Sequence, residues 1–147
     1  METLDKSTVQ ILINKAFEML NFSYVPYSRY TVGAALLAKN GTVYTGCNIE
    51  NASFGVTNCA ERTALFKAVS EGVKEFKAIA IVGGPQKKVA GICAPCGICR
   101  QALREFCDMD FTFILAKSKT EYELYSMKDI LPQSFKPDGE IGATQRA

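Results

Sequence analysis

Two cysteine-containing stretches, each at the start of a predicted helix, constrain the fold of this chain most strongly. Cys59 opens one predicted helix, and Cys96 and Cys99 form a Cys-x-x-Cys pair at the start of another. Helix N-termini lower thiol pKa values through their exposed N–H groups and dipole, and thiolates are the form that binds metals. If both helices pack on one sheet face with adjacent N-termini, the three thiols can hold Zn²⁺ with an open fourth position.

The chain contains six cysteines and no histidine. Without histidine the usual metal ligand, the usual general base and every Ser/His or Cys/His catalytic pair are excluded. The N-terminus has no apolar stretch of the signal-peptide type, so the cysteines indicate reduced thiols or metal ligands, and we expect a cytoplasmic protein. Catalysis would have to use carboxylates, thiolates or a metal.

Length and charge indicate one compact domain with a small partner. The 147 residues, of which 48% are hydrophobic, suit a single core, and we expect one domain over residues 1–135 with a polar, flexible tail over residues 136–147. The net charge is +2, and no basic run alternates with aromatic residues as a nucleic-acid groove requires. No segment approaches the length of a membrane span. We therefore expect neither a nucleic acid nor a membrane as partner.

Apolar periodicity predicts alternating helices and strands. A capping box of Ser7 and Gln10 predicts a first helix that ends near Asn21. The aromatic, proline-marked residues 24–30 are expected to form a loop with the potential to line a pocket. Asn40-Gly41 predicts a hairpin turn between the first two strands. Strands are expected over residues 31–38, 42–49, 76–82, 111–116 and 121–125. Further helices are expected over residues 59–71, 96–107 and 126–131.

Two charged residues beside Cys59 suit a catalytic metal site. Three thiolates around Zn²⁺ carry a net charge of −1, and the guanidinium of Arg62 can offset it and restore the acidity of a bound water. The carboxylate of Glu61 can take a proton from that water and pass it to a substrate nitrogen. Spacing alone does not place Glu61 over the metal, because residues two apart on a helix point in different directions.

The cysteines also allow other interpretations. Cys96-x-x-Cys99 alone could be a redox pair or half of a structural zinc site, and Cys93 with Cys96 has the same spacing. The lack of a fourth ligand decides against a closed structural site. Cys47, Cys93 and Cys107 lie in or beside apolar runs, so we interpret them as structural.

Several separate motifs carry a family resemblance. The Cys-Ala-Glu-Arg of residues 59–62 and the Pro-Cys-Gly-Ile-Cys of residues 95–99 resemble the signature of zinc deaminases. Residues 26–35 and 45–53 are similar to the small, homotetrameric type of cytidine deaminase. The likeness extends from the first helix to about Pro137, with the motifs in the same order.

The resemblance implies a fold and a catalytic centre. The fold would be a three-layer α/β, cytidine deaminase-like arrangement, with a mixed five-stranded sheet and helices on both faces, which agrees with the pattern above. Cys59, Cys96 and Cys99 would hold one Zn²⁺ per subunit, and Glu61 would be the proton shuttle that also contacts N3 of the base. Hydroxide would attack C4 of cytosine in cytidine or deoxycytidine and release ammonia.

The resemblance also implies the substrate contacts. Asn48 and Glu50 match residues that hydrogen-bond the ribose 3′-hydroxyl, and Tyr30 matches an aromatic that packs against the pyrimidine. Ala60 also falls among the substrate-binding positions. Phe135 and Phe54 match residues that reach a neighbouring subunit, which implies a homotetramer with shared active sites.

Two alternative functions stay open on the sequence. A deaminase of another cytosine-containing small molecule, such as blasticidin S, would share both zinc motifs, although Asn48 and Glu50 favour a nucleoside. A zinc-ribbon-like binding module would need a fourth ligand and a basic face, and neither is evident in the sequence.

Overall fold

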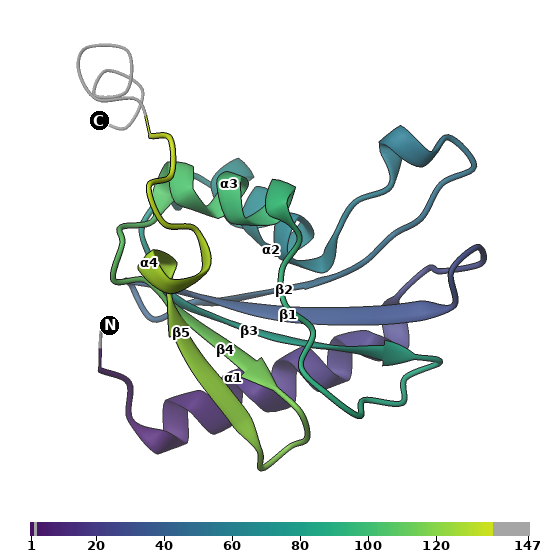
Figure 1. Ribbon diagram of the computed structural model, residues 1–147, viewed down its shortest axis with the longest axis horizontal. Helices are drawn as coiled ribbons and strands as arrows, with labels where there is room; N and C mark the ends of the chain where they lie inside the picture. The colour runs from purple at the N-terminus through teal and green to yellow at the C-terminus, as the bar shows by residue number, and fades with distance from the viewer. Residues whose placement is uncertain (2, 137–147) are drawn as a thin grey trace.

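A five-stranded mixed sheet forms the middle layer of the protein (Figure 1). The structure is a computed structural model that describes residue 1 and residues 3–136. The strands are β1 (Tyr30–Ala38), β2 (Val43–Cys47), β3 (Phe76–Pro85), β4 (Thr112–Ala116) and β5 (Tyr122–Ser126). Their order in the sheet is β2-β1-β3-β4-β5. Only the β3–β4 pair of this sheet is parallel, and the other neighbouring pairs are antiparallel.

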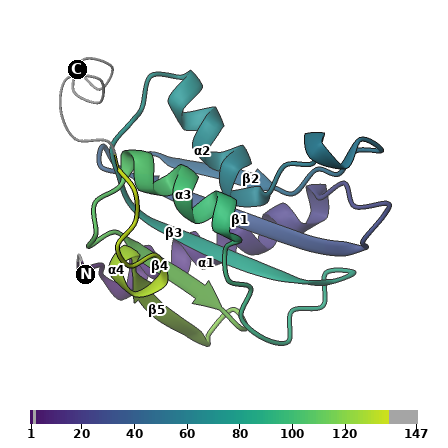
Figure 2. The same cartoon turned by 45° about the horizontal axis from the view of Figure 1, so that its top comes forward.

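Helices cover both faces of the sheet, which confirms the predicted three layers. Helix α1 (Lys6–Met19) lies on one face, whereas α2 (Ala60–Ser70) and α3 (Gly97–Phe106) lie together on the other (Figures 1 and 2). Short helical turns complete the described elements: η1 (Leu20–Phe22), η2 (Phe54–Val56) and α4 (Met127–Ile130). The alternation of strand side chains divides the core into one buried cluster beneath α1 and another beneath α2 and α3.

Strand β2 and helix α2 approach each other at backbone contact. A Cβ atom on Gly46 would lie 2.2 Å from the carbonyl oxygen of Ala60 and 2.6 Å from the backbone nitrogen of Ala64. Ala60, Ala64 and Ala68 are fully buried, as expected for the alanine face of this helix. The close approach fixes the start of α2, and therefore Cys59, against the sheet.

The predicted capping box of α1 is wrong. Asp5 is the N-cap, and its Oδ1 accepts a hydrogen bond of 2.7 Å from the backbone N–H of Thr8. Ser7 lies inside the first turn, and its hydroxyl donates to the same Asp5 oxygen at 2.6 Å. The side chain of Gln10 donates instead to Asn14 and to the carbonyl of Lys119. Aspartate is as good an N-cap as serine, and it acts here because the helix begins earlier than the pattern indicated.

The predicted hairpin is confirmed, with Gly41 at φ +91° in the turn, but two strand bounds differ by more than one residue. The second strand ends at Cys47, two residues early, because Ile49 leaves the sheet to form isolated bridges with Tyr24 and Asn58. Strand β3 extends to Pro85 instead of Val82, because β1 begins at Tyr30 and pairs with it there.

The last predicted strand and helix are both present, with bounds that differ by one residue at each end. Ser126 caps α4 through a capping box with Asp129. The predicted tail over residues 136–147 lies outside the described residues apart from Lys136, so the domain boundary at residue 135 stays a prediction. Within the described part, no helix has both the length and the apolar character that crossing a membrane requires.

The contact between β2 and α2 predicts a large cost for a single methyl group. Gly46→Ala would push α2 off the sheet and should lower the free energy of unfolding by about 3 kcal/mol, the upper range for overpacking. Gly55→Ala is the matched control, since a Cβ there would meet nothing within 4 Å. Urea unfolding of both variants measures the difference, and equal stability would contradict the backbone contact.

Candidate metal centre and active site

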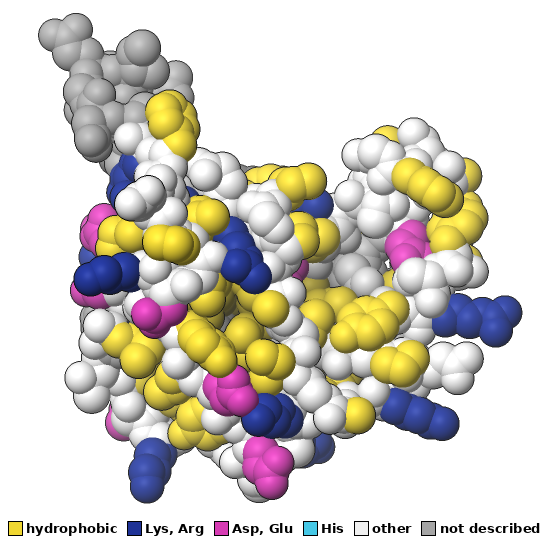
Figure 3. All heavy atoms as spheres, in the orientation of Figure 1, with side chains coloured by type: hydrophobic (Ala, Val, Ile, Leu, Met, Phe, Trp, Pro, Cys, Tyr) yellow, Lys and Arg dark blue, Asp and Glu magenta, His cyan; other side chains and the backbone are white. Residues whose placement is uncertain are grey.

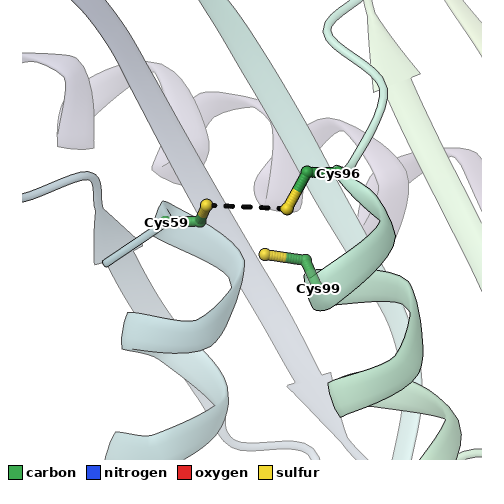
Figure 4. Close-up of side chains that lie close together, drawn as sticks. All are labelled: Cys59, Cys96 and Cys99. Carbon is green, nitrogen blue, oxygen red and sulfur yellow. Dashed lines mark hydrogen bonds between the residues drawn. The ribbon is translucent and has the colours of Figure 1, made fainter. Parts of the chain in front are cut away.

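Three cysteine sulfurs converge where α2 and α3 begin. Cys59 is the N-cap of α2, Cys96 is the N-cap of α3, and Cys99 lies in the first turn of α3. Their Sγ atoms all lie within 4.8 Å of one another, and those of Cys59 and Cys96 are 3.8 Å apart. Figure 4 shows the three side chains pointing toward one another from the two helices. The predicted meeting of the thiols is confirmed.

The sheet topology explains why the two helix starts meet. Strands β2 and β3 both run antiparallel to β1, so their carboxyl ends point to the same edge of the sheet. The chain leaves β2 to enter α2 and leaves β3 to enter α3, and both helices lie on one face. Because a helix that returns over a sheet starts near the carboxyl end of the preceding strand, both N-termini lie at that edge.

The three thiols fit a zinc ion with one open position. Tetrahedral coordination with Zn–S distances of about 2.3 Å separates the sulfurs by about 3.8 Å, which the Cys59–Cys96 pair already matches. A guanidinium nitrogen of Arg62, Nη2, donates to the Sγ of Cys59 at 3.4 Å. The Nε of Arg62 is buried and has no hydrogen-bond partner among the described residues. Such a buried positive charge suits a cluster of thiolates.

The surroundings of Cys59 favour its negatively charged form. The neighbouring Cys99 side chain, followed by Arg62, lowers the pKa of Cys59 to about 5. The pKa of Cys99 is raised in turn, first by its hydrogen bond with Cys59 and then by burial. These shifts favour the thiolate form of Cys59, which is the form that binds metals, and ligand thiols release their protons on metal binding.

Cys93, which has the competing Cys-x-x-Cys spacing, does not join the cluster. Its Sγ packs over Gly83, where a Cβ atom would lie only 2.7 Å from it. Burial raises the pKa of Cys93 to about 11, so it remains a neutral thiol. Cys47 and Cys107 are buried in the core, and all six cysteines, each within the described residues, are free of disulfides. The structure thus selects Cys96 and Cys99 over Cys93 and Cys96.

Glu61 reaches the sulfur cluster, which spacing alone could not establish. Its Oε2 accepts a hydrogen bond from the Sγ of Cys99 at 3.4 Å, and its side chain is only 3% exposed. Burial, with the negative charge of Cys59 as a smaller cause, raises the pKa of Glu61. A carboxyl group with a raised pKa next to an open metal position is suited to accept and return a proton.

Asn48 and Glu50 lie at the same edge and are held by backbone groups. The Oδ1 of Asn48 accepts from the N–H of Val32 at 2.9 Å, and its Nδ2 donates to the carbonyl of Tyr30 at 2.8 Å. The Oε1 of Glu50 accepts from the N–H groups of Tyr27 and Ser28 at 3.0 and 3.1 Å. The sequence marked the loop of residues 24–30 as pocket-lining, but the part it plays in orienting Glu50 is a tertiary feature that sequence reasoning missed.

The two predicted inter-subunit aromatics are both largely exposed. Phe54 lies on the loop with η2 that projects from the body (Figure 1), is 76% exposed and makes an edge contact with Tyr27 at 5.9 Å. A hollow of about 360 Å³ beside it is lined by Tyr27, Ser28, Glu50, Phe54 and Thr57. The space-filling view shows the surface hollowed between this loop and the rest of the molecule (Figure 3). Phe135 is 74% exposed.

Comparison with known proteins identifies the family. The family model described as the cytidine and deoxycytidylate deaminase zinc-binding region matches residues 6–115, which include all three sulfur ligands and Glu61. The chain belongs to the cytidine and deoxycytidylate deaminase family. Its membership agrees with the three-sulfur centre, and Zn²⁺ is the cofactor that Cys59, Cys96 and Cys99 are arranged to hold.

Individual members of the cytidine and deoxycytidylate deaminase family match nearly the whole chain. A cytidine deaminase of Sporosarcina psychrophila is 46% identical over 138 residues, which cover 93% of this chain and 98% of that protein. One from Halalkalibacterium halodurans is 48% identical over 126 residues, covering 86% and 92%. The crystal structure of cytidine deaminase from Burkholderia pseudomallei matches with a TM-score of 0.78 at 41% identity, covering 90% of this chain and all of that one. The predicted fold class is confirmed.

The sulfur geometry predicts different zinc contents for two cysteine variants. Cys96→Ala removes one of three ligands and should reduce bound zinc from about one ion per chain to nearly none. Cys93→Ala is the control with the rival spacing, and it should retain zinc because its thiol packs over Gly83. Elemental analysis of the purified variants measures both. Full zinc in Cys96→Ala, or its loss in Cys93→Ala, would contradict the assignment.

Proposed function

We propose that the protein hydrolyses cytidine and deoxycytidine to uridine and deoxyuridine and releases ammonia. The observation that carries the proposal is the buried carboxyl of Glu61, whose Oε2 lies 3.4 Å from the Sγ of Cys99 in a three-thiolate site with an open position. Family membership and relatives at 46% and 48% identity support the same reaction. An open site with a proton-carrying group suits hydrolysis, whereas a structural zinc site needs neither.

Glu61 is the proposed proton carrier. Zinc, when bound, supplies the Lewis acidity that makes water nucleophilic at neutral pH. The overall reaction adds one water across C4 of the base and removes the amino group as ammonia, so protons must move to the ring and to the leaving nitrogen. The carboxylate of Glu61 takes one proton of the water and delivers it to N3, then takes the second and delivers it to the amino group, which leaves as ammonia. Burial raises the pKa of Glu61, which favours its holding each proton between transfers.

Arg62 is proposed to offset the excess negative charge of the three thiolates around the metal. Three thiolates exceed the charge of one divalent cation, and the guanidinium donates to the Sγ of Cys59 at 3.4 Å. Hydrogen bonds to ligand atoms typically change metal affinity and activity 10- to 100-fold when they are lost. Arg62 therefore keeps the site close to neutral without taking a ligand position.

The proposed nucleoside contacts surround the start of α2. Asn48 and Glu50 are anchored so that their remaining hydrogen-bonding capacity can serve the ribose 3′-hydroxyl. Tyr30, at the start of β1, packs against the pyrimidine. Ala60 is the first residue of α2, and Cys59 caps that helix without a side-chain hydrogen bond, so the backbone there has free N–H capacity for the base.

We further propose a homotetramer in which Phe54 and Phe135 enter neighbouring sites. Large aromatic rings that are 76% and 74% exposed are costly in a monomer and common at interfaces. The backbone next to Phe135 is also held in place: Gln101 donates to the Phe135 carbonyl at 3.0 Å and Arg104 donates to Ser134 Oγ at 2.8 Å. An exposed aromatic ring on an anchored segment is suited to contact a neighbouring subunit.

The surroundings of the site agree with a small free substrate. A net charge of +2 offers little attraction for a polynucleotide, which favours a nucleoside. Six thiols without a disulfide favour a reducing compartment, and we propose the cytoplasm. Blasticidin S remains the second candidate substrate, and the anchored Asn48 and Glu50 pair, which suits a ribose, favours the nucleoside over it.

Glu61→Gln tests the reaction and the proton carrier together. Glutamine cannot exchange a proton, so kcat for cytidine should fall by a factor of about 10³ or more while zinc content and unfolding midpoint stay unchanged. The assay follows uridine and ammonia from cytidine, deoxycytidine, blasticidin S and a short single-stranded oligonucleotide. Wild-type protein inactive on both nucleosides would refute the function, and near-normal kcat in Glu61→Gln would refute the role of the carboxyl.

Mixed subunits test the shared sites. Glu61→Gln and Phe135→Ala homomers should each be weakly active, but unfolding and refolding them together should recover activity, because some sites then pair an intact Glu61 with an intact Phe135. Mixing Glu61→Gln with Cys96→Ala subunits is the control, since both changes fall in the same site and no intact site can form. Sedimentation must show a tetramer. A fully active monomer, or equal recovery in the control, would contradict the proposal.

A further inference from the structure

We propose that Cys93 and Gly83 act as a pair that sets how much space the cytosine ring finds in the pocket, and so determine which C5-substituted cytidines are accepted. The inference rests on the proposed deaminase function and deepens it. It concerns a cysteine that is not a metal ligand and a glycine in the middle of the sheet, and it assigns both to substrate selection.

Gly83 faces the site. It pairs with Val32 in the sheet, and the alternation of β3 places it on the same side as Ile79 and Ile81, which pack beneath α2 and α3. The atoms nearest to a Cβ built on Gly83 would be Cys93 Sγ at 2.7 Å, Cys93 Cβ at 2.9 Å and Tyr30 Cε1 at 3.2 Å. Cys93 and Tyr30 therefore meet above this glycine.

The environment of Gly83 differs from that of other close-packed glycines. A Cβ on Gly33, Gly46 or Gly84 would first strike a backbone carbonyl, at 2.0 to 2.2 Å, so those positions serve main-chain packing. The nearest atoms to a Cβ on Gly83 all belong to side chains. The missing side chain at this position thus makes room for the thiol of Cys93 rather than for a neighbouring strand or helix.

Cys93 lies beside the catalytic groups as well as beside Tyr30. Cys93 is on the segment that leads into α3, three residues before Cys96, and packs against the buried cluster beneath α2 and α3. Its raised pKa, caused first by burial and then by the negative charge of Glu61, agrees with this position. An interaction with Cys93 also raises the pKa of Tyr30, after burial. The side chain is only partly buried. A small, uncharged thiol therefore forms part of the wall between the proposed pyrimidine-packing ring and the reacting centre.

The chemistry of the base indicates which substituent this wall would meet. The reaction occurs at C4, whose two ring neighbours are N3 and C5. Glu61 serves N3 in the proposed mechanism, so a group on C5 is the substituent beside the reacting carbon that the carboxyl does not have to contact. One methyl group in a closely packed pocket changes discrimination by about 10- to 200-fold, so a wall of this kind decides acceptance.

A cycle of three variants tests the pair. Cys93→Gly enlarges the space and should raise the kcat/KM for 5-methylcytidine relative to cytidine by about tenfold. Gly83→Ala forces the thiol aside and should raise the KM for both substrates. Adding Cys93→Gly to Gly83→Ala should restore the KM, because the new methyl group occupies the space that the thiol leaves. Cys93→Ser, which keeps a side chain of similar length, should retain the wild-type ratio.

Zinc content and unfolding midpoint are measured for every variant, so that a lost metal or fold is distinguished from a changed pocket. An unchanged substrate ratio in zinc-loaded Cys93→Gly would overturn the inference, even if Gly83→Ala failed to fold. Absence of rescue in a folded double variant would overturn the pairing of the two residues. Cytidine turnover by the wild type is a separate readout, so an active enzyme with an unchanged ratio refutes this inference and leaves the proposed function standing.

Discussion

The meeting of two helix N-termini at one sheet edge is the constraint on which the rest of the structure depends. Strands β2 and β3 run in the same direction on either side of β1, and each is followed by a helix on the same face. This arrangement brings Cys59 to within 3.8 Å of Cys96 although 37 positions separate them in the chain. The backbone contact of Gly46 with α2 holds the start of this helix against the sheet. Sulfur ligands on two rigid helices need little rearrangement to bind a metal, which favours affinity.

Charge is balanced within this centre by residues of the same short helix. Arg62 faces the thiolates, and Glu61 is buried beside Cys99 with a raised pKa caused first by burial. Removing a carboxyl and a guanidinium from water is costly unless each has a partner. Buried charged groups of this kind are typical of catalytic sites, which agrees with the roles proposed for Glu61 and Arg62. Outside the centre, the described ion pairs are partly exposed and contribute little to stability.

The two aromatic residues that the proposed tetramer would use are both exposed on a single chain. Phe54 is carried on a projecting loop, and Phe135 lies on a segment tied to α3 through Gln101. The same helix α3 thus presents metal ligands at its start and supports Phe135 further along. In the proposed tetramer, the geometry of one subunit would set the position of an aromatic in the next. A fold of this size can in this way enclose a substrate that one subunit leaves partly exposed.

The sequence by itself determined the elements and the chemistry. The spacing of Cys59, Cys96 and Cys99, the absence of histidine and the strand and helix periodicity are local patterns, and they led to a zinc site in an α/β fold. Spacing by itself left the pair of Cys93 and Cys96 open as a rival to Cys96 and Cys99. The tertiary structure explains why the rival pair is not used, because the thiol of Cys93 packs over Gly83. It also decided that Glu61 reaches Cys99 and that Asp5, not Ser7, caps α1. These outcomes depend on contacts between distant segments and on where a helix begins, and neither is encoded in the spacing of residues along the chain.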